Sequence, residues 1–408
     1  LVGHARRMIC PFTTHHGRRL HACAPSLADE RWARRAMQQE PLQGLTPERL
    51  SELAGIELVD ARRIVSLVHR LGALPARCPA TVRRLALDAV RRVAFVPTLE
   101  IADQQASQVD PFVKLAVRLA DTRVIETVRI PLERAGRYTV CVSSQAGCAL
   151  ACAFCATGRL GLGRNLEAWE IVEQVRLVRA GLPEGGRVHG VVFQGMGEPL
   201  ANVERVLAAI RVLGEPSAQA IDQRNITVCT AGLPSGIRRL AAEAPNVRLG
   251  LSIGDVRPGR RRALLPIDDS HPLEEVLDAA AEHARTTRLG PMWAVALLAG
   301  VNDQDEAAIA LAARARRFAE EVGVRPTVRL IPYNEVDGAG FTRPSDVEIE
   351  RFRSTLLAHG VGSIVRYSGG GDVAAACGQL ARPEAGGKLT RLRALRRPAG
   401  SQGSEELA

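Results

Sequence analysis

Three cysteines, Cys148, Cys152 and Cys155, lie within one short stretch, CALACAFC, and form the most specific chemical pattern in the chain. Thiolates are soft ligands that suit iron, and three of them on one loop can ligate three irons of a [4Fe–4S] cluster. The run has no fourth cysteine, which leaves one iron open to another ligand. Zinc normally takes four closed ligands, and this spacing differs from paired Cys-x-x-Cys units. The pattern predicts an iron–sulfur site.

The spacing C-x3-C-x2-C, with an aromatic residue before the last cysteine, resembles the radical S-adenosylmethionine (SAM) superfamily. In that superfamily the open iron binds the amino and carboxylate groups of SAM. One electron from the cluster then cleaves the sulfonium and yields a 5′-deoxyadenosyl radical. The resemblance implies two cofactors, a [4Fe–4S] cluster and S-adenosyl-L-methionine, and an external electron donor such as flavodoxin.

The wider sequence resembles a narrower group, the RlmN/Cfr-type rRNA adenine methyltransferases, over roughly residues 45–382. The matching stretches are CVSSQAGCALACAFCATGRLGLGRNL, GMGEPL at 195–200, LIPYN at 330–334 and AACGQL at 375–380. In this family a C-terminal cysteine is first methylated by one SAM. A second SAM is cleaved to the radical, which abstracts hydrogen from that methyl group, and the resulting methylene radical adds to adenine. The resemblance therefore implies RNA methylation that uses two SAM molecules.

The resemblance also implies three catalytic roles. Cys377 matches the cysteine that becomes S-methylcysteine, and Cys141 matches the resolving thiol that releases the protein–RNA crosslink and leaves a disulfide. Glu126, in the context ETVRIP, matches the acceptor of the ring proton. Taken alone, a buried cysteine is more often structural and a lone glutamate is more often a solvated charge. Their register with the cluster motif favours the catalytic interpretation.

The expected SAM contacts come from several short motifs. The small residues of GMGEP let the backbone approach a cofactor, and its glutamate can bind amino or ribose groups. Three positions depart from the family pattern: its contacting histidine is Gly254, so that contact can only use the backbone, its Ser-Thr pair is Cys229-Thr230, and Thr-Arg-Gly becomes Ser-Gly-Gly at 368–370. The expected cofactor-binding residues are Gly197, Glu198, Cys229, Ser252, Ile253, Gly254 and Asn334.

Hydrophobic periodicity predicts an α/β fold in which strands and helices alternate after residue 138. Strands are expected at 188–194, 225–230, 247–252, 292–298, 327–331 and 363–367, and helices near 166–181, 202–213, 234–244, 272–288, 303–322 and 345–358. Six such units favour a parallel sheet curled into a partial (β/α)6 barrel, with the active site at the carboxyl ends of its strands. The expected division is a weakly ordered extension at 1–40, an N-terminal helical RNA-docking domain at 41–98, an antiparallel β linker region at 99–137, the radical-SAM core at 138–382 and a basic, disordered tail at 383–408.

Composition sets broader limits on function. The chain has a formal net charge of +10 and a pI of about 9.6, which favours a polyanionic partner, although basic tails alone could produce the excess. The sequence holds no run of about 20 apolar residues, so no membrane span is expected. Nine cysteines, four of them between 141 and 155, fit metal or redox chemistry in a reducing compartment, and the cytoplasm is the expected location.

The leading hypothesis is a monomeric enzyme that methylates C2 of an adenosine in 23S rRNA, with transfer RNA as a second candidate substrate. One alternative is a Cfr-type C8 methyltransferase that confers ribosomal antibiotic resistance. Another is a diverged paralogue with a different substrate. A hypothesis of another class, a non-catalytic RNA-binding protein on the same fold, predicts loss of at least one of the five functional cysteines, and the sequence retains all five.

Overall fold

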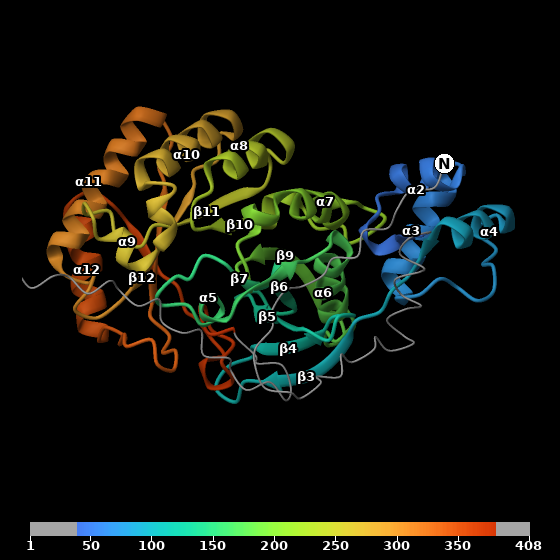
Figure 1. Ribbon diagram of the computed structural model, residues 1–408, viewed down its shortest axis with the longest axis horizontal. Coiled ribbons are helices and arrows are strands. Elements are labelled where there is room, and N and C mark those ends of the chain that lie inside the picture. Colours follow the sequence, from blue (N-terminus) through green and yellow to red (C-terminus); the bar gives the residue numbers. More distant parts are fainter. Residues whose placement is uncertain (1–38, 381–408) are drawn as a thin grey trace, which may run out of the picture. The chain divides into compact units, whose positions relative to one another are not determined.

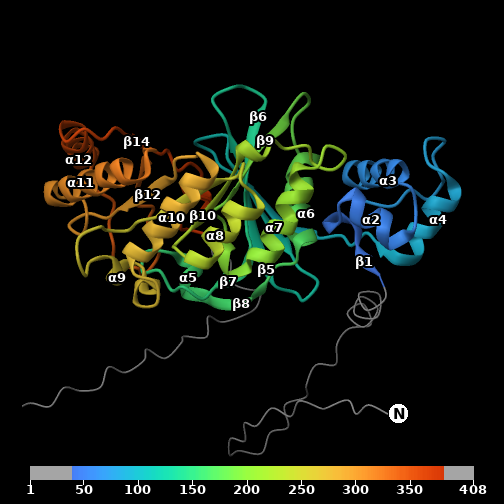
Figure 2. The same ribbon diagram turned by 90° about the horizontal axis from the view of Figure 1, so that it is seen from above.

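The computed structural model describes residues 39–380. The expected extension at 1–40 and tail at 383–408 therefore lie almost entirely outside the described residues, and the division into domains stays a prediction. The fold class is confirmed: the described chain has a mixed α/β architecture built on one large, mostly parallel sheet (Figures 1 and 2). No helix within the described part of the chain is both long and apolar enough to cross a lipid bilayer.

Residues 40–95 form a small helical region with its own apolar core. Thr46 caps the first long helix by accepting a hydrogen bond from the Arg49 amide, and Gly55, with φ 62°, ends it in the left-handed conformation. Leu50, Val65 and Leu87 are buried together between the helices. The elements are β1 (Glu40–Pro41), η1 (Leu42–Gly44), α2 (Pro47–Ala54), α3 (Leu58–Leu71), α4 (Arg84–Val93) and β2 (Ala94–Phe95), and β1 pairs with β2.

The main sheet has ten strands in the order β14-β13-β12-β11-β10-β9-β6-β5-β4-β3. The antiparallel part consists of β3 (Glu100–Ala106), β4 (Val113–Arg118), β5 (Val124–Pro131) and β6 (Arg137–Val142). These strands extend the same sheet as the parallel part. The parallel part continues from β6 through β9 (Arg187–Phe193), β10 (Ile226–Thr230), β11 (Arg248–Ser252), β12 (Met292–Leu297), β13 (Thr327–Pro332) and β14 (Ser363–Val365).

The parallel strands alternate with helices that cover one face of the sheet (Figures 1 and 2). These helices are α6 (Ala168–Ala180), α7 (Val203–Gly214), α8 (Pro234–Glu243), α10 (Leu273–Thr287), α11 (Asp305–Val322) and α12 (Asp346–Ala358). Trp293 of β12 and Phe318 of α11, both almost fully buried, pack edge to face in the core between the two layers. The opposite face of the strands is therefore free to line a cavity.

Short elements cover the carboxyl ends of the strands. After β6 the chain forms β7 (Gln145–Cys148), the cysteine loop, α5 (Ala156–Leu160) and β8 (Gly161–Asn165), and β7 pairs with β8. Further 3-10 turns and a short helix follow other strands: η2 (Pro199–Asn202), α9 (Arg261–Leu264), η4 (Pro266–Asp269) and η5 (Gly371–Val373). One more turn, η3 (Gln223–Asn225), directly precedes β10. The cysteine loop thus lies between β6, the first strand of the parallel part, and α6.

Candidate active site

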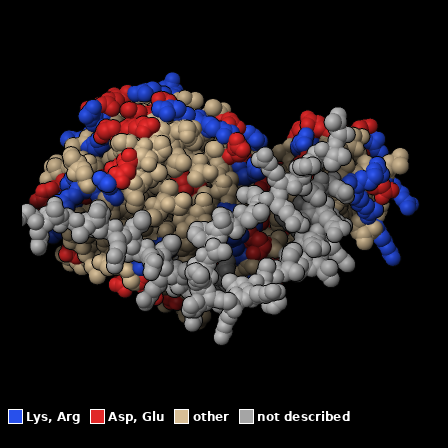
Figure 3. Space-filling view, viewed as in Figure 1, with Lys and Arg blue, Asp and Glu red and all other residues tan. Residues whose placement is uncertain are grey.

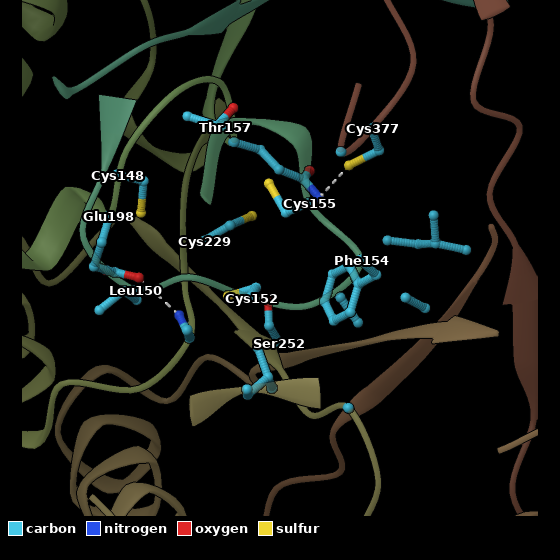
Figure 4. Close-up of a pocket in the computed structure, with 18 of the residues that line it drawn as sticks. Cys148, Leu150, Cys152, Phe154, Cys155, Thr157, Glu198, Cys229, Ser252 and Cys377 are labelled. Carbon is cyan, nitrogen blue, oxygen red and sulfur yellow. Dashed lines mark hydrogen bonds between the residues drawn. The ribbon is translucent and has the colours of Figure 1, made fainter. Parts of the chain in front are cut away.

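The three cysteines of the CALACAFC stretch line one cavity (Figure 4). Cys148 ends β7, and the loop that carries Cys152 and Cys155 is held by backbone hydrogen bonds on both sides. The amide of Ala153 donates to the carbonyl of Leu264 at 3.0 Å, and the amide of Ala156 donates to the carbonyl of Gly378 at 2.8 Å. The loop is thus tied to the turn after β11 and to the C-terminal segment that carries Cys377.

These thiols fit the donor set of an iron–sulfur cluster. Burial raises the pKa of Cys148 to about 11 and also raises that of Cys152, with the neighbouring thiols adding to the effect. Such thiols keep their protons until a cation replaces them. Among residues 39–380 no three Cys, His, Asp or Glu side chains converge on a single metal ion. Ligands that each hold a different iron of one cluster need no such convergence.

The GMGEP turn after β9 forms the wall beside the cysteine loop. Gly197 has φ 97°, and a Cβ there would come within 2.5 Å of the Gln145 Cβ, so only glycine fits this approach. The Glu198 side chain is buried and accepts hydrogen bonds from the amides of Leu200 and Ala231, both at 2.9 Å. Burial raises its pKa despite these bonds. Glu198 therefore joins the ends of β9 and β10 while it lines the cavity.

The remaining expected cofactor contacts fall into two groups. Cys229, Ser252, Gly254 and Asn334 line the same cavity as the cluster thiols. Ile253 does not line it: this side chain is buried in the core on the other side of the strand, and its amide donates to the carbonyl of Ala294. Because neighbouring residues of a strand point to opposite faces, only the backbone of Ile253 can reach the cavity.

Cys141 and Cys377, far apart in sequence, line a second cavity together with Gln194 and Arg366. The Gln194 amide nitrogen donates to the Cys377 sulfur at 3.0 Å (Figure 4), and the Arg366 guanidinium donates to the amide oxygen of Gln194 at 2.7 Å. Asn334 donates to the backbone carbonyl of Cys377 at 3.0 Å. The C-terminal thiol is therefore fixed between the cluster cavity and Cys141.

The surroundings of the two thiols raise the pKa of both. Burial, followed by the nearby Cys377 sulfur, raises the pKa of Cys141 to about 12. Burial also raises the pKa of Cys377, and the positive charge of Arg366 opposes that rise. All seven cysteines within residues 39–380 are free, so the expected disulfide is absent from this part of the chain.

Glu126 lies on β5 and belongs to a third cavity, next to that of the two thiols. Its carboxylate forms an ion pair with Lys114 at 3.0 Å, and both side chains are almost fully buried. The Lys114 ammonium also donates to the carbonyl of Ala374, three residues before Cys377. Val128, two residues along β5 from Glu126, pairs with Cys141 in register, so Glu126 and Cys141 project from the same face of the sheet. The second oxygen of Glu126 is buried without a hydrogen-bond partner.

Comparisons with known proteins agree with this geometry. A family profile described as the Radical SAM superfamily matches residues 142–312. A probable RNA methyltransferase of Sorangium cellulosum is 64% identical over 361 residues, covering 84% of this chain and 92% of the relative. The dual-specificity RNA methyltransferase RlmN of Anaeromyxobacter dehalogenans is 38% identical over 349 residues, covering 83% and 91%. The chain belongs to the RlmN/Cfr family.

A solved structure gives the same result at the level of the fold. The crystal structure of a radical SAM methyltransferase from Sphaerobacter thermophilus is 37% identical and matches with a TM-score of 0.74, covering 84% of this chain and 99% of that one. Nearly the whole of the solved chain therefore has a counterpart in this RlmN/Cfr protein.

Four residues of this RlmN/Cfr site were not anticipated from the sequence: Lys114, Gln194, Arg261 and Arg366. Arg261 is buried, donates to the backbone carbonyls of Ile253 and Ala231, and forms an ion pair with Asp268 at 2.7 Å. It thereby fixes the turns that follow β10 and β11. Each of the four acts through specific side-chain contacts, and the spacing of residue types carries no signal for such contacts.

Proposed function

We propose that this chain is a radical-SAM RNA methyltransferase that forms 2-methyladenosine in 23S rRNA, with transfer RNA as a second substrate. The observation that supports this proposal most is that Cys377 lies between the three cluster thiols and the thiol of Cys141. Cys377 lines the cavity of the three cluster thiols and also the cavity of Cys141. A sulfur between a cofactor cavity and a second thiol suits a relay that receives a methyl group on one side and delivers it on the other.

A [4Fe–4S] cluster and SAM, held by the three cysteines and by Glu198, Ser252 and Asn334, would supply methyl groups and a 5′-deoxyadenosyl radical. The protein's own groups then have separate roles. The Cys377 sulfur carries the methyl carbon, and that carbon forms the bond to the adenine ring. Gln194 and Asn334 hold that residue in place. The Cys141 thiol loses its proton and its sulfur attacks the Cys377 sulfur. The bond between the Cys377 sulfur and the methylene carbon then breaks, that carbon takes up a proton to become the methyl group of the RNA, and a disulfide joins the two cysteines.

In this proposal Glu126 removes the proton from the ring carbon. Its unpartnered oxygen is the free acceptor that the step requires, while Lys114 neutralises the other oxygen of this buried carboxylate. The strand register places Glu126 on the face that also carries Cys141, so the base and the resolving thiol can reach the same ring. The backbone of the segment from Val373 to Cys377 lies against both groups.

The RNA substrate rests on the relatives. One relative is called a probable RNA methyltransferase and others are called dual-specificity RNA methyltransferase RlmN. We propose the same class of substrate here, and the dual specificity supports transfer RNA beside 23S rRNA. The proposal includes an external reductant such as reduced flavodoxin, because formation of the radical consumes an electron.

The test is mass spectrometry of nucleosides from protein-free 23S rRNA and from transfer RNA, after incubation with anaerobically reconstituted protein, reduced flavodoxin and SAM. Detection of 2-methyladenosine is the expected result. Cys78→Ala is a matched control, since Cys78 is exposed and outside every cavity described above. If only 8-methyladenosine appears, the C8 alternative is correct. If 5′-deoxyadenosine forms and neither RNA is methylated, the substrate is a different one and the proposal fails.

A further inference from the structure

Three arginines line the inner face of the parallel sheet below the cofactor cavity. Arg248 begins β11, four residues before Ser252, and Arg329 on β13 pairs in register with Ala294 of β12. Ser252 and Ala294 both line the cofactor cavity. Side chains alternate along a strand and paired residues share a face, so Arg248 and Arg329 project from the same inner face as those two residues. Arg366, one residue beyond β14, lines the neighbouring cavity of the two thiols.

These arginines have no counter-ion. Within residues 39–380, Arg248 and Arg329 form no side-chain hydrogen bond and no ion pair, and the guanidinium of Arg366 bonds only to the neutral amide of Gln194. Burial lowers the pKa of Arg329, and the positive charges of Arg366 and Arg248 lower it further. The three cations are therefore close enough to repel one another, and no carboxylate relieves the repulsion.

The outer surface of the protein differs. Basic and acidic side chains alternate along the upper, outer edge in Figure 3, where α7, α8, α10 and α11 lie in Figure 1. On those helices Arg238 pairs with Glu282 at 2.6 Å, and Arg317 pairs with Glu321 at 2.7 Å. Like charges that gather without a counter-ion reduce stability unless an anion binds to them. The inner face therefore carries unpaired cations, and it lies next to the catalytic thiols.

We propose that Arg248, Arg329 and Arg366 bind phosphates of the RNA strand on either side of the target nucleotide, so that the strand runs along the inner face between β11 and β14. This inference rests on the proposed function for the identity of its polyanion. RNA phosphates accept the forked hydrogen bonds that guanidinium groups donate, and such contacts fix the register of a strand without reading its sequence. The target base would then point towards Cys141 and Cys377.

The test compares Arg248→Gln/Arg329→Gln with the control pair Arg317→Gln/Arg353→Gln, whose arginines lie on the outer helices. Arg366 is left unchanged because it orients Gln194. Affinity for a fluorescent single-stranded RNA of the target loop is measured by anisotropy at several salt concentrations. The inner pair should weaken binding at least tenfold and reduce the slope of log affinity against log salt by about 1.4, since each lost phosphate contact removes about 0.7. The control pair should match wild type.

Three further measurements make the result unambiguous. The KM for RNA should rise at least tenfold with kcat unchanged, and methylation of Cys377 in the absence of RNA should be unaltered. Arg248→Lys/Arg329→Lys retains both charges and should keep the wild-type salt slope. Unchanged affinity of the inner Gln pair, or an equal loss in the Lys pair, overturns the proposal. Anisotropy measures binding without turnover, so its result is independent of methylation. Weaker RNA binding by the inner Gln pair would support the arginine site even if the wild-type protein methylated no RNA. Normal binding by that pair would reject the site even if methylation were confirmed.

Discussion

The two cavities that share Cys377 are built in different ways. The cofactor cavity takes the three proposed cluster thiols from eight consecutive residues, and its other walls are turns that follow neighbouring strands. The thiol cavity joins β5, β6, the end of β9 and the segment after β14, which are far apart in sequence. Radical formation therefore depends mostly on local structure, whereas transfer to RNA depends on long-range contacts. The two functions should separate under mutation.

Cys152→Ala should have the largest effect, because it removes a ligand from the cavity on which both functions depend. The expected result is loss of the brown colour of the reconstituted protein and at least a thousandfold loss of 5′-deoxyadenosine formation and of RNA methylation. Iron content, visible absorbance and product formation measure this. Since the thiol cavity is untouched, thermal stability of the metal-free protein should stay near wild type. A coloured, active variant would show that these cysteines do not hold the cluster.

Cys377→Ala should separate the two cavities. It removes the methyl-carrying sulfur but none of the three cluster thiols, so the cluster should form with the iron content and visible absorbance of wild type. RNA methylation should fall below detection, as should the mass increase of one methyl group on the protein. Intact-protein and nucleoside mass spectrometry give both results. If this variant still methylated RNA, the cysteine-methyl mechanism would be wrong for this chain.

The sequence predicted the cofactor cavity better than the thiol cavity, because the first depends on local patterns and the second on long-range contacts. The cysteine loop, the GMGEP turn and the parallel strands depend on local patterns, and the predicted strands begin and end within about two residues of β9 to β14. The motifs also identified Cys141, Cys377 and Glu126 through family resemblance. The sequence did not reveal the ion pair of Lys114 with Glu126, or the chain of contacts from Arg366 through Gln194 to Cys377. The first contact depends on the register of two strands and the second on segments far apart in sequence, and the spacing of residue types encodes neither.

Lys114→Met tests the deepest contact of the thiol cavity. Removing one partner of a buried ion pair leaves an uncompensated carboxylate, which costs about 3–5 kcal/mol of stability and favours protonation of Glu126. We expect RNA methylation to fall about 10- to 100-fold, in the range of a lost general base. Methylation of Cys377 and formation of 5′-deoxyadenosine should persist.

The double variant Lys114→Met/Glu126→Gln distinguishes catalysis from folding. It removes both charges, so most of the lost stability should return, as measured by thermal unfolding, while RNA methylation stays low. Lys114→Arg keeps the charge and should recover part of the activity. If the double variant regained methylation together with stability, Glu126 would not be the proton acceptor and the ion pair would be structural.

The smallest effect is expected at Gly254, on the cofactor side of the comparison. Its φ of 70° places it in the left-handed region, and its carbonyl accepts a hydrogen bond from Asn302 at 2.9 Å. Gly254→Ala should cost about 1–2 kcal/mol of stability, because an L-residue is strained in the left-handed region. The added Cβ would also meet the Leu265 side chain at 3.0 Å. Gly254→His, which supplies the family's usual side chain, carries the same strain. Thermal unfolding measures the stability of the Gly254→His variant, and titration with SAM measures its affinity. Tighter SAM binding than wild type would mean that the backbone can present a histidine at this position. Weaker binding would mean that this turn has adapted to glycine.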